Sequence, residues 1–128
     1  MSRTTEKRLR TLEIILLIAV GGFVGASLRN VFAIVIPGLG GTFAANVFGC
    51  LALGFLSYEA EFVGVLSEET GYVASTGFLA SLTTYSTFAL ETVQAAPILG
   101  IMNVVGNYSA GFVAVLVGRA AAKSIEVD

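Results

Sequence analysis

Four long apolar segments, separated by short polar breaks, make up most of this chain of 128 residues. The segments cover residues 14–36, 42–58, 72–90 and 97–117. Crossing the hydrocarbon core of a bilayer, which is about 30 Å thick, takes about 17–25 helical residues, and each segment reaches this length. The pattern predicts an all-α membrane protein in which a single domain, residues 1–128, crosses the bilayer four times.

The breaks between the segments are built from residues that end helices or that carry charge. The sequence "PGLGG" at residues 37–41 predicts a short turn, and Gln94–Pro97 predicts another, with Pro97 suited to the first turn of a helix. Residues 59–70 predict an acidic loop. Connections this short favour an up-down-up-down bundle.

Small residues are frequent within the segments, as in "GGFVG" at residues 21–25. Small side chains let helix backbones approach closely, and this close packing drives association in lipid, where no hydrophobic effect operates between helices. Tight packing inside the bundle explains most of these residues. Because four short helices enclose little interior, we also expect a contact with a second subunit.

Composition supports the membrane interpretation and excludes several functions. Hydrophobic residues make up 55% of the chain and charged residues only 12%, too few to cover a small soluble domain. A net charge of −2 and the lack of a basic stripe argue against nucleic-acid binding. With no histidine and a single cysteine, Cys50, we expect no haem, zinc or disulfide, and no serine nucleophile has a histidine base. We therefore expect no enzymatic activity.

The N-terminal segment predicts a retained membrane span rather than a cleaved signal peptide. Basic residues precede an apolar run, as in a signal peptide, but the run continues through Ile36 without an A-x-A cleavage pattern. With four spans, both termini and the acidic loop lie on the same side. That side carries six of the seven Lys and Arg residues, so the termini are predicted to face the cytoplasm across the cell membrane.

The third segment is unusually polar for its place in the chain. Its end reads "SLTTYSTFALE", residues 81–91, and the hydroxyl side chains there would cover every side of a regular helix. Two or three such residues can bond to carbonyls of their own helix without further role, but a locally broken helix uses this many better. Non-helical backbone at this depth is tolerated only inside protein or beside a watery cavity. The stretch therefore suggests an ion site near the bilayer midplane, with a hydroxyl-rich packing helix as the alternative.

A few further polar residues lie inside the apolar segments. Asn46, Asn103 and Asn107 are expected to point inward, either toward such a site or toward hydrogen bonds between helices. Arg29 and Glu91 are the only ionisable residues within the apolar body, each close to a span end. This position indicates a vestibule or structural role rather than a proton relay.

These motifs resemble the Fluc/CrcB family of fluoride channels over essentially the whole chain. The matching stretches are "GGFVGASLRN" at 21–30, "GTFAANVFGC" at 41–50, "GFLASLTTYSTFALE" at 77–91, and the G…N pattern of the last span. Two signatures are specific: G-T-x-x-x-N at the start of the second span and a T-T-F-S-T-F-x-x-E pattern in the third.

The resemblance implies a fluoride-selective channel that exports cytoplasmic fluoride and lowers its toxicity. Members are antiparallel, dual-topology dimers of four-helix subunits with a broken third helix, two pores and a central structural sodium ion. The resemblance assigns the sodium to backbone carbonyls of Ala80 and Thr83. It also implies a set of residues that contact fluoride in the pore: Asn46, Tyr85, Phe88, Ser86, Thr87 and Asn103. A vestibule or structural role is expected for Thr42, Glu91 and Arg29.

Such assignments suit the chemistry of the anion. A pore that strips water from fluoride must replace it with donors, which amides, hydroxyls and the electropositive edges of aromatic rings supply. Carbonyl oxygens suit a sodium ion.

The chain departs from the family pattern at three places. Tyr85 stands where the family has the first phenylalanine of a pair, and its added hydroxyl needs a partner. Ala80 and Ser81 replace two glycines ahead of the break, which restricts the backbone there. Asn103 occupies a position often held by tyrosine.

The uneven distribution of Lys and Arg bears on the partner subunit. A chain that inserts in both orientations should have balanced charges, so we expect an antiparallel heterodimer with an oppositely biased paralogue; a homodimer is the alternative. Two other functions stay open. A proton-coupled exporter of the small multidrug-resistance type would need an acid inside the first span, where only Glu13 lies at its edge. A non-conducting partner subunit would result if Tyr85 blocked the pore.

Overall fold

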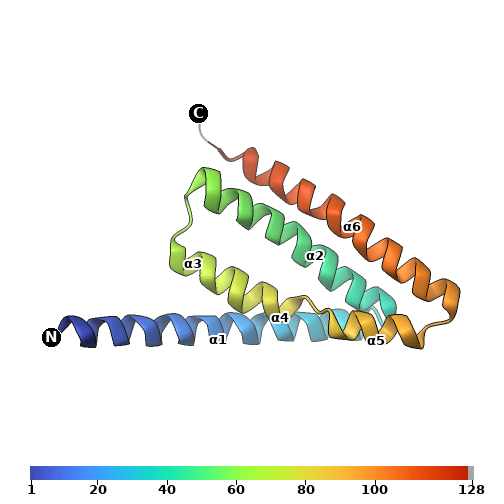
Figure 1. Ribbon diagram of the computed structural model, residues 1–128, viewed down its shortest axis with the longest axis horizontal. Coiled ribbons are helices and arrows are strands. Elements are labelled where there is room, and N and C mark those ends of the chain that lie inside the picture. The colour runs from blue at the N-terminus through green and yellow to red at the C-terminus, as the bar shows by residue number, and fades with distance from the viewer. Residues whose placement is uncertain (127–128) are drawn as a thin grey trace.

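The computed structural model describes residues 1–126, and the regular structure within that range is helical (Figure 1). Three long helices alternate with shorter helical pieces. The elements in chain order are α1 (Arg3–Val35), α2 (Leu39–Tyr58), the π-helix η1 (Glu59–Val63), α3 (Glu68–Tyr72), the π-helix η2 (Val73–Leu79), α4 (Ala80–Leu82), α5 (Ser86–Gln94) and α6 (Pro97–Lys123).

Three helical stretches are long and apolar enough to cross a membrane: Arg3–Val35, Leu39–Val63 and Pro97–Lys123. They contain the predicted spans 14–36, 42–58 and 97–117, with Ile36 capping the first, and each helix is longer than its predicted span. α1 begins at Arg3, so its first turns continue beyond the apolar segment as a helix. The predicted span 72–90 is divided among several short elements, which is why it does not appear as one long helix.

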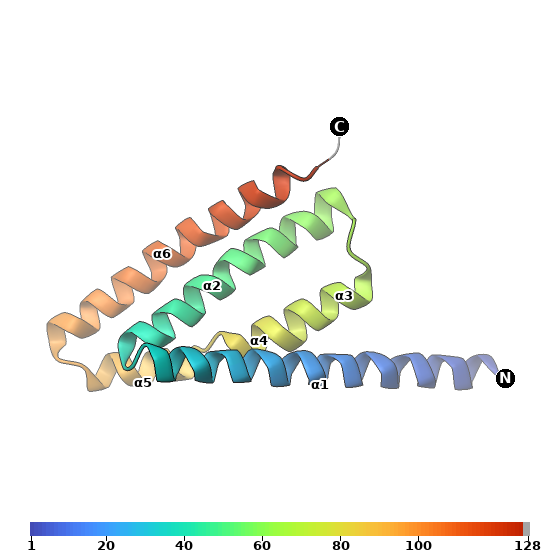
Figure 2. The same cartoon turned by 180° about the vertical axis from the view of Figure 1, so that it is seen from behind.

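The chain folds into two pairs of neighbouring elements. α2 and α6 lie side by side along their whole length, while η2 and α4 pack along α1 (Figures 1 and 2). α3, η2, α4 and α5 follow one another along α1, in the same chain direction. The bundle therefore has an α2–α6 layer and an α1 layer, and the interrupted third segment lies between them.

Close backbone contacts explain why glycine is needed at particular helix positions. A Cβ atom on Gly77 of η2 would lie 2.7 Å from the carbonyl oxygen of Ile18 in α1. A Cβ atom on Gly118 of α6 would overlap the carbonyl oxygen of Leu51 in α2. Real side chains do not come this close, so both helix contacts require glycine.

The third segment loses its helical form at residues 83–85. α4 ends at Leu82, Thr83 is extended with φ −79° and ψ 156°, and α5 begins at Ser86. The π-helix η2 precedes this interruption directly. Wider turns of this kind are frequent at functional sites.

The predicted acidic loop 59–70 is wrong at both ends. Residues 59–63 continue α2 as the π-helix η1, and α3 already begins at Glu68, where Ser67 accepts a hydrogen bond from the N–H of Thr70. The remaining connection turns at Gly64, with φ +70°. Glu59, only 2% exposed, holds the turn by accepting a hydrogen bond from the Leu66 N–H at 2.6 Å. Local hydrogen bonding thus replaces a solvated loop. The predicted turn at 37–41 is shorter than expected, because α2 begins at Leu39.

Candidate functional site

Asn46 of α2 clamps the backbone of the interrupted segment. Its Nδ2 donates to the carbonyl oxygen of Thr84 at 3.1 Å, and its Oδ1 accepts from the N–H of Thr84 at 2.8 Å. One side-chain amide thereby satisfies both backbone groups of a residue that has no helical partners. Because a primary amide has two N–H groups, one donor of Asn46 is left for another ligand.

The clamp frees two carbonyl oxygens from the helical pattern. In a regular helix the N–H of Thr84 would bond to Ala80 and that of Thr87 to Thr83. Here Thr84 donates to Asn46, and Thr87 donates to Oγ1 of Thr84 at 3.3 Å. Within residues 1–126, the carbonyl oxygens of Ala80 and Thr83 therefore accept no hydrogen bond. Free carbonyl oxygens beside a helix break are suitable ligands for a hard cation.

Three aromatic rings form a row beside the break. The ring centroids of Tyr85 and Phe88 are 5.9 Å apart, and those of Phe88 and Tyr108 are 6.3 Å apart at an interplanar angle of 77°. Phe88 is buried at 8% exposure, whereas Tyr85 is 74% exposed and Tyr108 56% exposed. The central ring is thus held on both sides by tyrosines.

These rings and the break line one groove of about 720 Å³, bounded by α2, η2, α4, α5 and α6. Asn46, Ala80 and Thr83 also line it, so the clamping residue, the two residues with freed carbonyls and the aromatic row border one space. Unpaired backbone carbonyls do not face lipid, because each costs several kcal/mol in hydrocarbon. The carbonyls of Ala80 and Thr83 therefore need a ligand or a protein neighbour wherever they lie at membrane depth.

A chain of hydrogen bonds ties α5 to α6 behind the aromatic row. Asn107 donates to Oδ1 of Asn103 at 2.9 Å, Asn103 donates to Oγ1 of Thr92 at 2.8 Å, and Thr92 donates to the carbonyl oxygen of Phe88 at 2.7 Å. Asn103 is buried at 8% exposure, and its amide serves this chain. The chain fixes the backbone of Phe88 against α6.

A second, smaller cavity of about 260 Å³ lies on the other side of the break. It contains all three residues of the expected vestibule, Thr42, Arg29 and Glu91, together with Thr84 and Thr87. Oε2 of Glu91 is buried and has no hydrogen-bond partner among the described residues. The two ionisable residues of the apolar body therefore lie around one polar cavity.

The structure thus separates the predicted pore residues into three places. Asn46, Tyr85 and Phe88 line the groove, Thr87 lines the smaller cavity, and Asn103 lies in the hydrogen-bond chain. Ser86 is exposed and lies near Oγ1 of Thr84 at 3.4 Å. Within one subunit, Ser86, Thr87 and Asn103 therefore do not line a common cavity, and their assignment to the pore stays a prediction.

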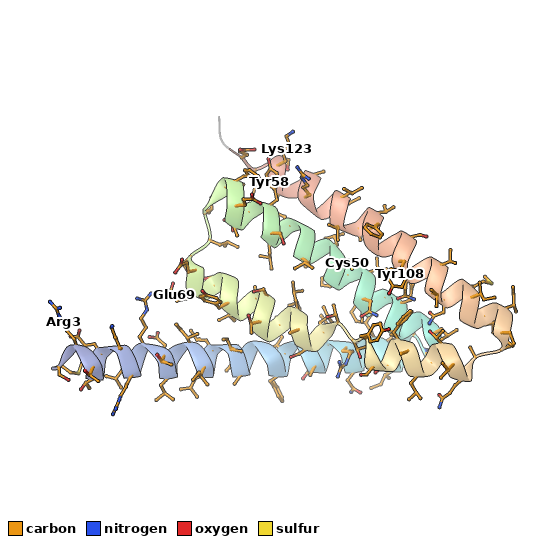
Figure 3. All side chains as sticks on the ribbon, in the orientation of Figure 1. Arg3, Cys50, Tyr58, Glu69, Tyr108 and Lys123 are labelled. Carbon is orange, nitrogen blue, oxygen red and sulfur yellow. The ribbon has the colours of Figure 1, made fainter. Side chains whose placement is uncertain are left out.

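The sequence patterns did not indicate two residues of the site, Thr92 and Tyr108. Tyr108 lies near the middle of α6 (Figure 3), although tyrosine in membrane helices is enriched at the interfaces near the helix ends. That unusual depth was a usable signal. Thr92 follows Phe88 by four residues, the spacing at which a hydroxyl bonds a preceding carbonyl, but many threonines share that spacing.

The fold and this site define a multi-pass helical membrane protein with polar groups gathered around a helix break. A family model described as "CrcB-like protein, Camphor Resistance (CrcB)" matches residues 16–119, and the chain belongs to this family.

Several relatives are similar over most of their length. A protein of Haloarcula marismortui named "Fluoride-specific ion channel FluC 1" is 53% identical over 85% of each chain. A "Fluoride-specific ion channel FluC 1" of Natronomonas pharaonis is 52% identical over 80% of this chain and 88% of its own. A "Fluoride-specific ion channel FluC 2" of Halobacterium salinarum is 50% identical over 88% of each chain.

Proposed function

We propose that this protein is a fluoride-selective channel that lets cytoplasmic fluoride leave the cell across the cell membrane. The names of the relatives support fluoride as the transported ion. The groove supports passage through a channel. The observation that carries the proposal is the gathering of a spare amide donor, a phenol hydroxyl and a buried phenylalanine ring in one groove at the break.

The chemistry of these groups suits a small anion that has lost its water. The spare N–H of Asn46 and the hydroxyl of Tyr85 can donate hydrogen bonds, and the edge of the Phe88 ring is electropositive. Donors held by the fold replace water without having to reorganise. The residues that line the groove include no acid.

The carbonyl oxygens of Ala80 and Thr83 would hold a structural sodium ion, because both lack a hydrogen-bond partner within residues 1–126. A bound cation would supply positive charge that makes the protein interior more favourable for anions. Replacement of the family's two glycines by Ala80 and Ser81 does not prevent this role, because Ala80 is helical with φ −62° and needs no glycine.

We further propose that α3, η2, α4 and α5 together form the third of four membrane spans, and that two subunits pair antiparallel. A second subunit would cover the freed carbonyls, which cannot face lipid. The charge bias favours a paralogue as the partner, with both termini of this chain in the cytoplasm.

Fluoride efflux from liposomes, with a potassium ionophore to balance charge, tests the proposal. Protein reconstituted alone or with the candidate paralogue should release fluoride rapidly and without a pH gradient, while chloride stays inside. Efflux only under a pH gradient would instead indicate a proton-coupled exporter. Absence of efflux with every partner would show that the proposed function is wrong, and conduction only with a paralogue would identify this chain as a partner subunit.

A further inference from the structure

Tyr108 is a polar residue whose position demands a partner. Its side chain projects from near the middle of α6 into the groove beside Phe88 (Figure 3). The phenol hydroxyl makes no hydrogen bond with residues 1–126, and neither does that of Tyr85. Tyr108 is 56% exposed within one subunit, so its hydroxyl is free to donate to a group that enters the groove, and an unpaired hydroxyl is costly in hydrocarbon.

Tyr85 and Tyr108 both pack against the ring of Phe88. Both tyrosine rings pack on Phe88, at 5.9 Å and 6.3 Å between centroids, one from the break just before α5 and one from α6. Both residues also line the groove. A protonated phenol is a donor as well as an acceptor, and the groove carries no positive side chain that would compete for an anion.

We propose that Tyr108 is a fluoride-binding residue, whose hydroxyl donates to the anion beside Phe88 and so compensates for the asparagine at position 103. This inference rests on the proposed function and adds to it a donor outside every recognised motif. Asn103 is not placed to supply that donor, because it is buried at 8% exposure, does not line the groove, and donates from its amide to Thr92. The aromatic row thus provides two hydroxyl donors, Tyr85 and Tyr108. The family pattern has phenylalanine at the position of Tyr85.

Two substitutions separate the hydroxyl from the ring. Tyr108→Phe removes only the hydroxyl and keeps the packing on Phe88, whereas Tyr108→Leu removes both. A hydrogen bond to a charged group contributes about 1.5–3 kcal/mol, so Tyr108→Phe should weaken fluoride binding about tenfold or more. Tyr72→Phe is the matched control, because Tyr72 is 50% exposed and lies outside the groove.

The direct measurement is a fluoride titration of protein labelled with ¹³C at the tyrosine ring carbon that bears the hydroxyl. The chain has four tyrosines, and each signal is assigned by its own Tyr→Phe variant. Fluoride should shift the signals of Tyr85 and Tyr108. The signal of Tyr58, whose hydroxyl already donates to Glu126 at 2.9 Å, and that of Tyr72 should stay in place. Chloride at the same concentration should shift none of them.

The outcomes distinguish this inference from the proposed function. A fluoride-dependent shift of Tyr108 without any efflux would support the binding site while showing that the channel function is wrong. Efflux with an unmoved Tyr108 signal, or unchanged fluoride affinity in Tyr108→Phe, would overturn the inference alone. A loss of dimer association in Tyr108→Phe at unchanged affinity would also overturn it, by assigning the hydroxyl to the partner subunit.

Discussion

At the scale of single residues, the aromatic pair Tyr85 and Phe88 at the start of α5 has unequal members. Phe88 is buried and held between two other rings, while Tyr85 is largely exposed at the edge of the groove. Substitution of Phe88 therefore changes the centre of the row, whereas substitution of Tyr85 changes its border.

We predict that Phe88→Ile abolishes fluoride efflux, because an aliphatic side chain of similar bulk has no electropositive ring edge. Tyr85→Phe should retain measurable efflux at a lower rate, since it keeps the ring and restores the family residue but removes one of the two hydroxyl donors. Initial rates in the liposome assay measure both effects. Efflux that persists in Phe88→Ile would show that this ring is not part of the pore.

Asn46 has a second role that its motif did not reveal. Besides the pore donor that we propose it supplies, it satisfies both backbone groups of Thr84. A residue with two functions responds to substitution in two measurable ways.

We predict that Asn46→Asp lowers fluoride efflux at least about tenfold, since it replaces N–H donors by a negative charge. It should also destabilise the protein by about 1–3 kcal/mol, because the carbonyl of Thr84 loses its donor. Thermal unfolding in detergent and the efflux assay report the two effects separately. The control Gln94→Glu adds the same charge at the exposed end of α5, and equal losses in both variants would contradict the assignment.

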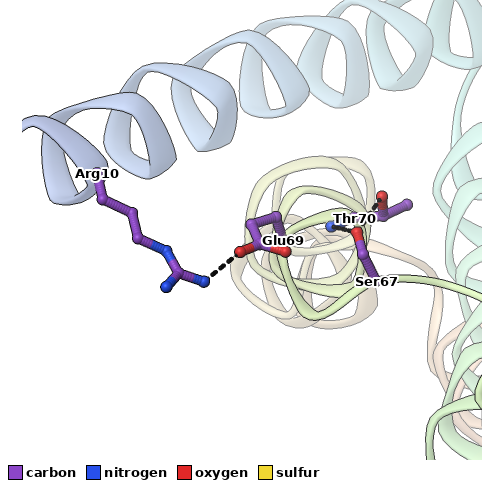
Figure 4. A network of polar contacts seen from close by, with 4 residues as sticks. All are labelled: Arg10, Ser67, Glu69 and Thr70. Atoms are coloured by element: carbon purple, nitrogen blue, oxygen red, sulfur yellow. Dashed lines mark hydrogen bonds and ion pairs between the residues drawn. The ribbon is translucent and has the colours of Figure 1, made fainter.

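At the scale of elements, an ion pair connects the first turns of α1 to α3. Arg10 donates to Oε1 of Glu69, next to the cap formed by Ser67 and Thr70 (Figure 4). This contact lowers the pKa of the Glu69 carboxyl below its ordinary value of 4.5, mainly through the hydrogen bond from Arg10. The long N-terminal extension of α1 is thereby attached to the segment that leads to the break.

We predict that Arg10→Gln raises the pKa of Glu69 toward its ordinary value, whereas Arg8→Gln leaves it unchanged. A carboxyl whose pKa is lowered on folding adds stability above the pKa of its unfolded state, and this stability disappears as the pH falls through the lower, folded value. The contact should therefore open only in acid below about pH 4.5. A ¹³C titration of the carboxyl measures the shift, and identical titrations in all three proteins would show that the pair does not form.

The π-helix η2 and the break that follows it are also held in place by contacts with neighbouring helices. η2 packs along α1 through Gly77, and Asn46 on α2 then holds the residue where the helix ends. Each half of the third segment is thus positioned by a different neighbour. The break is a consequence of two packing contacts as much as of the local sequence.

At the scale of the whole molecule, orientation in the membrane connects charge to assembly. Six Lys and Arg residues lie near the termini, on the side that also carries the acidic connection. Acidic residues have little effect on orientation, so the basic ones should retain that side in the cytoplasm.

We predict that a cysteine placed at Ser2, with Cys50 replaced by alanine, resists an impermeant maleimide added outside intact cells. One orientation for the chain expressed alone would agree with a heterodimer. If about half of the molecules react, the chain inserts both ways and pairs with itself. Lysed cells, in which the cysteine must react fully, are the control.

The sequence by itself determined the helical class, the positions of three spans and the residues at the break. Apolar length and charge position are local properties, so the pattern of residues 14–36, 42–58 and 97–117 was sufficient to predict helices there. The crowding of hydroxyls at residues 81–87 likewise indicated that a regular helix would leave too many of them without partners.

Only the tertiary structure decided which polar groups share a space. Two contacts join residues that are far apart in the chain: Asn46 pairs with Thr84, and Tyr108 packs on Phe88. The carbonyls of Ala80 and Thr83 lack hydrogen bonds because the helix is interrupted where Asn46 binds Thr84. The division of Ser86, Thr87 and Asn103 among three places has the same origin. A hydrogen bond depends on the distance and direction between two groups in space. Spacing along the chain does not give these quantities for groups on different helices.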